Sequence, residues 1–197
     1  MEIVMKVKRM YVLILFLVFL FVENTSYSQN YEQTYSFVRI EDGDTIKIKK
    51  DGGKSGEELR LQLYGIDAPE SIENPKLILD VKRIKLPKED IIELGQKSAS
   101  FLYRLIKLNN NKIQLKEKLD KKDKYGRYLV EIFVTSNKES VNSYMIKKGY
   151  AIALKNDDGL KNSKLIKHQK QAIEAKEGLW GMHGEIMQKW SDVKKNE

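Results

Sequence analysis

The chain has 197 residues, 41% of them hydrophobic and 32% charged, which is ordinary for one globular domain with its own core plus extensions. Its formal net charge of +8 favours polyanions or anionic membranes as partners, although a basic composition serves solubility as often as binding. There is no cysteine, which excludes a disulfide partner. The two histidines, His168 and His183, lack acidic or thiol companions at ligand spacing. Their isolation argues against a zinc site or a histidine-based triad.

The N-terminus has the pattern of a signal peptide. Basic residues between positions 6 and 9 precede an unbroken apolar run of 13 residues, 10–22, and Ser26 and Ser28 supply the small residues that a signal peptidase reads. A membrane-spanning helix needs roughly 18 or more apolar residues. We therefore expect cleavage after Ser28, export to a periplasm or the medium, and no stable membrane association of the mature protein. The alternative is an uncleaved N-terminus that tethers the protein to a surface.

Alternating hydrophobic residues predict three antiparallel strands in a meander between Tyr35 and Tyr64. The first two strands are joined by a tight turn at Asp42-Gly43, and the second and third by a flexible turn near residues 49–56. Asp44 follows the first turn directly, so we expect it at the beginning of the second strand.

The third strand runs into the sequence L-Q-L-Y-G-I-D-A-P-E, residues 61–70. Gly65 permits a bend and Pro69 favours an extended backbone, so Asp67 and Glu70 should stand at the end of a strand. Asp44 could lie beside Asp67, and acidic oxygen ligands without histidine or cysteine suit Ca²⁺ or Mg²⁺. Taken alone, each stretch could equally be an ordinary acidic turn.

Downstream, residues 71–90 read as a lysine-rich loop in which Pro75 and Pro87 discourage a continuous helix. Apolar spacing then predicts three helices, and alternation predicts two further strands. The expected helices are 89–108, 141–148 and 160–176, and the expected strands are 113–115 and 128–134, with a turn at 123–127 between them. From Gly181 onward we expect a loosely attached tail, residues 182–197.

Five short motifs in this order resemble the staphylococcal nuclease (thermonuclease) family. They are D-G-D-T at 42–45, G-I-D-A-P-E at 65–70, D-K-Y-G-R at 123–127, V-N at 141–142 with G-Y-A at 149–151, and G-L-W at 178–180. The resemblance covers about residues 36–181. It implies an α+β fold, a five-stranded OB-fold β-barrel with three α-helices, within one nuclease domain at 29–181 that follows a signal peptide at 1–28.

The resemblance also implies calcium-dependent hydrolysis of phosphodiester bonds in DNA and RNA with little sequence specificity, by a monomer. Asp44, Asp67 and the backbone carbonyl of Ala68 would hold Ca²⁺, with Mg²⁺ or Mn²⁺ also possible. Glu70 would act as general base on a water molecule, or would order that water electrostatically. Arg127 would offer two parallel donors to the phosphate as charge builds in the transition state.

One departure from the family concerns a second phosphate-binding arginine, whose position is occupied by Gln62. Arg60 lies two residues earlier on the same strand face, so we predict that it partly replaces the missing contact while Gln62 gives a neutral hydrogen bond. Lys124 and Tyr125 are expected to flank the substrate by charge and by stacking on a base. The missing arginine leaves an alternative open, a catalytically weak OB-fold module that only binds nucleic acid.

Overall fold

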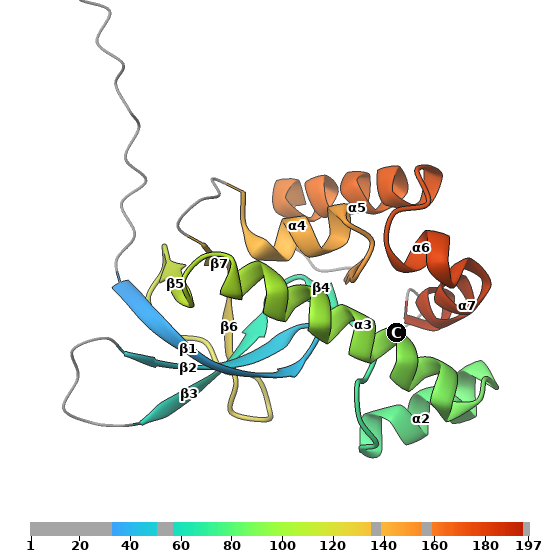
Figure 1. The fold of residues 1–197 in the computed structure, drawn as a ribbon, viewed down its shortest axis with the longest axis horizontal. Helices are drawn as coiled ribbons and strands as arrows, with labels where there is room; N and C mark the ends of the chain where they lie inside the picture. The colour runs from blue at the N-terminus through green and yellow to red at the C-terminus, as the bar shows by residue number, and fades with distance from the viewer. Residues whose placement is uncertain (1–32, 51–56, 135–138, 155–158, 195–197) are drawn as a thin grey trace, which may run out of the picture. The chain divides into compact units, whose positions relative to one another are not determined.

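The computed structural model describes residues 33–50, 57–134, 139–154 and 159–194, all within one compact unit (Figure 1). The predicted signal peptide, residues 1–28, lies outside the described residues. Among the residues that are described, no helix is both long and apolar enough to cross a membrane.

Six strands form the main sheet in the order β6-β3-β2-β1-β5-β7, and β4 pairs separately with β8. Neighbours are antiparallel except β3 and β6, which are parallel. Only Glu131 separates the two edge strands in the chain, so the sheet curls until its edges meet at this residue. The strands are β1 (Gln33–Asp42), β2 (Thr45–Lys50), β3 (Glu58–Leu63), β4 (Ile66–Asp67), β5 (Lys112–Leu115), β6 (Tyr128–Val130), β7 (Ile132–Phe133) and β8 (Ile152–Ala153).

The α+β class and the curled OB-type sheet are confirmed, but the numbers of elements differ from the prediction. The stretch 128–134, expected as one strand, is divided at Glu131 into β6 and β7. The described part of the chain also contains more than three helices. They are α2 (Pro75–Ile84), α3 (Lys88–Lys107), α4 (Val141–Lys147), α5 (Gly159–Glu174), α6 (Leu179–Met182) and α7 (Gly184–Lys194).

Helix α2 corrects the prediction of a loop at residues 71–90. Asn74 caps the helix by accepting a hydrogen bond from the backbone N–H of Leu77 at 2.9 Å. Pro75 occupies the first turn, where a missing N–H costs nothing and the fixed φ suits the helix. The proline that was expected to prevent a helix therefore begins one.

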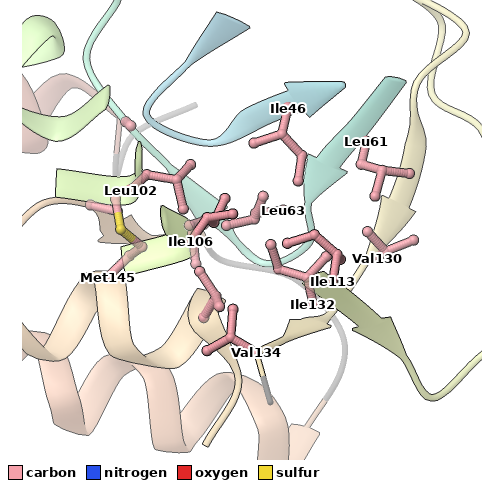
Figure 2. Packing of buried hydrophobic residues seen from close by; sticks show 14 of the residues in the cluster. Ile46, Leu61, Leu63, Leu102, Ile106, Ile113, Val130, Ile132, Val134 and Met145 are labelled. Carbon is pink, nitrogen blue, oxygen red and sulfur yellow. The ribbon is translucent and has the colours of Figure 1, made fainter. Parts of the chain in front are cut away.

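The main core fills the inside of the curled sheet and is closed by α3 and α4 (Figure 2). Inward-facing residues of β2 and β3, such as Ile46 and Leu63, are fully buried against Leu102 and Ile106 of α3. Met145 of α4 is buried in the same cluster. This packing fixes the ends of β2 and β3, where the acidic residues lie.

A second apolar cluster joins α2 to the C-terminal helices. Leu77 of α2 and Leu94 of α3 are fully buried together with Met187 and Trp190 of α7. In Figure 1, α2, α6 and α7 gather around the N-terminal half of α3. The prediction of a loosely attached tail after residue 181 is therefore wrong for residues 184–194, because two large side chains of α7 belong to the core.

Candidate active site

Three carboxylates predicted from separate motifs lie together at the ends of β2 and β4. Asp44, Asp67 and Glu70 are 5, 7 and 5% exposed, so all three are buried despite their charge. Asp44 Oδ2 accepts the backbone N–H of Ala68 at 3.1 Å, and the carbonyl of Asp44 accepts the N–H of Leu63 at 2.8 Å. These bonds hold the D-A-P-E turn against the start of β2.

Two glycines allow α3 to approach this turn closely. A side chain at Gly95 would place its Cβ 2.2 Å from the carbonyl oxygen of Glu70. A side chain at Gly43 would collide in the same way with Ser98 of α3. On the other side, Ser71 Oγ and N–H both donate to Asp42 Oδ1, at 2.6 and 3.0 Å. The backbone at Glu70 is therefore clamped between α3 and the end of β1.

Helix α2 brings a lysine into the carboxylate cluster. Lys76 Nζ donates to Asp67 Oδ1 at 2.8 Å and also to Glu70 Oε1. The cap residue Asn74 donates to the other oxygen of Glu70, Oε2, at 2.5 Å. Both oxygens of Glu70 are thus bound by the first turn of α2.

The charges of the cluster perturb one another. Burial is the main reason why the pKa of Asp44 is raised from an ordinary value of 3.8 to about 6; Lys76 opposes this rise and Asp67 adds to it. Burial would lower the pKa of Lys76, but Asp67, Asp44 and Glu70 outweigh it and hold that pKa well above its ordinary value. The cluster therefore keeps a cation among its carboxylates.

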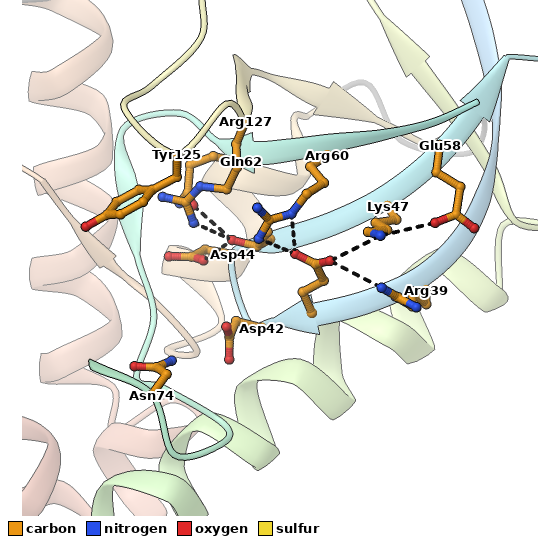
Figure 3. Close-up of polar contacts among 12 residues, drawn as sticks. Arg39, Asp42, Asp44, Lys47, Glu58, Arg60, Gln62, Asn74, Tyr125 and Arg127 are labelled. Carbon is orange, nitrogen blue, oxygen red and sulfur yellow. Dashed lines mark hydrogen bonds and ion pairs between the residues drawn. The ribbon is translucent and has the colours of Figure 1, made fainter. Parts of the chain in front are cut away.

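Arg127 enters the site from the turn before β6. Its Nε donates to Asp123 Oδ2 at 2.7 Å and its Nη1 to Thr45 Oγ1 at 3.0 Å. The Thr45 hydroxyl is also 2.9 Å from Asp44 Oδ1. Burial would raise the pKa of Asp123, but hydrogen bonds from the backbone and side chain of Arg127 outweigh this effect. The pKa of Asp123 is therefore lowered, and its carboxylate stays charged. One end of the guanidinium is thereby fixed beside the acidic cluster (Figure 3).

Gln62 and Arg60 lie as the strand periodicity predicts, but they have different partners. Gln62 is opposite Thr45 in the sheet, and its Oε1 is 2.9 Å from the Thr45 hydroxyl. Arg60 Nε donates to Glu41 Oε2 at 2.7 Å, and its Nη2 is 2.6 Å from the same oxygen (Figure 3). The structure thus places Gln62 at the site and engages Arg60 in an ion pair beside it.

Lys124 and Tyr125 stand at the outer rim. Tyr125 is 63% exposed, with the guanidinium carbon of Arg127 5.3 Å and Lys124 Nζ 5.2 Å from the centre of its ring. An exposed ring beside two cations is suited to stacking on a base.

Sequence reasoning missed four residues of this site. Asn74 and Lys76 fall in the stretch predicted as a loop, although Asn-Pro is a pattern that begins helices and would have placed Lys76 in a first helical turn. Thr45 and Asp123 belong to the motifs at 42–45 and 123–127, but no role was assigned to them. Both orient Arg127, as described above.

The donor atoms suit a hard divalent cation. Asp44 and Asp67 supply carboxylate oxygens of the kind that such an ion prefers, and the ammonium of Lys76 lies among these carboxylates. Within the described residues, no three acidic, histidine or cysteine side chains form a ready-made metal centre. An ion held by these residues would share the carboxylate of Asp67 with Lys76.

Comparison with known proteins gives one family and several relatives. The family described as "Staphylococcal nuclease homologue" matches residues 60–182. A thermonuclease of Staphylococcus hyicus is 31% identical over 150 residues, 76% of this chain and 76% of that protein. A thermonuclease of Staphylococcus intermedius is 29% identical over 149 residues, 75% of this chain and 76% of that protein. The endonuclease YhcR of Bacillus subtilis is 30% identical over 113 residues, 57% of this chain and 8% of that protein.

Proposed function

We propose that this chain, which belongs to the staphylococcal nuclease family, is a nuclease that hydrolyses phosphodiester bonds in DNA and RNA with the help of a bound calcium ion. The observation that carries the proposal is the convergence of Asp44, Asp67 and Glu70 beside Arg127, whose guanidinium is oriented by Asp123 and Thr45. A site that only bound nucleic acid would gain nothing from buried carboxylates facing a polyanion.

The residues divide the work by their chemistry. Asp44, Asp67 and the carbonyl of Ala68 would hold the ion, which when bound neutralises phosphate oxygens. Arg127 binds the phosphate and stabilises the charge that builds on it during the reaction. Glu70 accepts the proton of the attacking water once its oxygens are released from α2, or orders that water. Lys124 and Tyr125 hold the neighbouring nucleotides at the rim.

A second candidate function is a nucleic-acid-binding module with weak catalysis. Gln62 favours it, because a neutral amide stands where the family has an arginine, and Arg60 is paired with Glu41. The buried acidic trio weighs more heavily, since binding a polyanion alone gains nothing from carboxylates at the site.

Export is the remaining part of the proposal. The support is the sequence pattern of residues 1–28, with the protein acting in a periplasm or the medium as a monomer. Fractionation of cells that express the full chain tests this, because a tethered protein would stay with the membranes at full length.

The direct test of the enzymatic proposal is DNA cleavage by variants of the acidic cluster. Asp67→Asn and Glu70→Gln each remove one charge and keep the shape, and Glu174→Gln on the exposed surface of α5 is the matched control. We expect Glu70→Gln to lose at least about a hundredfold in kcat, the range of a positioned acid–base group. We expect Asp67→Asn to lose activity through weaker ion binding, and the control to keep full activity. Two site variants with unchanged turnover would overturn the proposal.

A further inference from the structure

Lys76 interacts with both carboxylates assigned to the ion, by a hydrogen bond to Asp67 and by electrostatic attraction to Asp44. Its ammonium binds one oxygen each of Asp67 and Glu70, and it also acts electrostatically on Asp44. Calcium takes carboxylate oxygens at about 2.3–2.6 Å. An ammonium hydrogen-bonded to Asp67 would compete with a doubly charged ion for that carboxylate, and the two cations would repel each other.

The surroundings of Lys76 give the ammonium somewhere to go. Its side chain is 42% exposed, whereas those of Asp67 and Glu70 are 10 and 6% exposed. Part of the lysine side chain thus faces solvent while its ammonium lies among carboxylates, so displacement requires a rotation of this side chain toward water. The helix itself is anchored by Leu77 in the second core cluster, so the lysine stays tethered close to the site.

The position of Lys76 in α2 is also unusual for a lysine. The first turn of a helix carries the positive end of the helix dipole, which disfavours a cation. Lys76 is tolerated in that turn because Asp67 and Glu70 accept hydrogen bonds from its ammonium. When an ion binds Asp44 and Asp67, it weakens the attraction that holds the ammonium in the cluster, and solvent becomes the more favourable environment for the lysine.

We propose that Lys76 is a built-in counter-cation that fills the carboxylate cluster in the absence of metal and is displaced by an incoming divalent ion, so that this residue sets the affinity of the site. The inference rests on the proposed ion-dependent function. It makes Lys76 a competitor of the ion, not a ligand or a catalytic residue.

The test is calcium binding by isothermal titration calorimetry at low ionic strength without nucleic acid. Lys76→Met removes the competing charge and keeps the aliphatic stem, and Lys76→Arg keeps a charge. Lys88→Met is the matched control, since Lys88 is paired with Glu73 outside the cluster at 2.7 Å. We expect Lys76→Met to lower the Kd for calcium by about tenfold or more, equivalent to about 1.4 kcal/mol. We expect Lys76→Arg and Lys88→Met to stay within about threefold of the wild type.

Thermal unfolding gives a second readout. In a chelator, Lys76→Met should melt below the wild type, because the carboxylates lose their counter-charge, and calcium should raise its Tm more than that of the wild type. An equal or higher Kd for Lys76→Met would overturn the inference while leaving the ion site in place. No calcium binding by either protein would overturn the inference and the proposed ion dependence together.

Discussion

Replacing Asp44 by asparagine should stabilise the ion-free protein at neutral pH although it damages the site. Burial raises the pKa of Asp44 from 3.8 to about 6. A tenfold change in an acidity constant corresponds to about 1.4 kcal/mol, so charging this group in the folded protein costs about 3 kcal/mol at pH 7. This shift already includes the opposing attraction of Lys76, so asparagine removes the net cost. We therefore expect a gain of about 1–3 kcal/mol in the free energy of unfolding.

The pH dependence identifies the cause of this gain. Because the folded state binds the Asp44 proton more tightly than the unfolded state, the wild type loses stability as pH rises between about 4 and 6. The gain of Asp44→Asn should be absent near pH 4, should grow through that window and should be constant above it. Urea unfolding in a chelator at several pH values measures it, with Glu174→Gln as the surface control. A variant less stable than the wild type at pH 7, or a gain independent of pH, would refute the reasoning.

Four further predictions concern the substrate side and the scaffold. Arg127→Ala should lower kcat on the order of 10³-fold at saturating calcium, the range of an arginine that stabilises a phosphoryl transition state, and an unchanged kcat would exclude that role. Arg60→Ala should lower kcat less, because Glu41 already engages Arg60, and Gln62→Arg should raise kcat. If Arg60→Ala leaves kcat unchanged and Gln62→Arg gives no gain, the site works without a second arginine. Activity at limiting DNA should fall steeply between about 50 and 200 mM salt if basic residues dock the polyanion, and a flat profile would contradict this. Trp190→Ala should lower the free energy of unfolding by about 3–5 kcal/mol in denaturant titrations, with Trp190→Phe much milder; a near-silent Trp190→Ala would mean that α7 does not support the core.

The strands and the acidic residues were predictable because their signals are local. Alternating side chains indicated β2 and β3, and the turn residues Gly43 and Gly65 placed Asp44 and Asp67 at strand ends. Strand periodicity also placed Gln62 and Arg60 on one face. It could not reveal that Arg60 binds Glu41, because that partner lies on β1 and depends on sheet register.

The second core cluster was not predictable from local patterns. Leu77 and Trp190 are more than a hundred residues apart. Their burial depends on packing between α2 and α7, and a pattern within either segment does not show which element covers it. The same long-range contact places Lys76 in the acidic cluster.

Ion-dependent hydrolysis at the acidic cluster is tested most directly by adding calcium, then a chelator, then calcium again to one assay of the wild-type protein. Release of acid-soluble fragments from single-stranded DNA is followed in calcium, then after excess chelator, and then after calcium is restored. We predict that the rate falls to background with the chelator and returns with calcium. A full rate that persists in the chelator would contradict the assignment of Asp44, Asp67 and Ala68 as an ion site that catalysis requires.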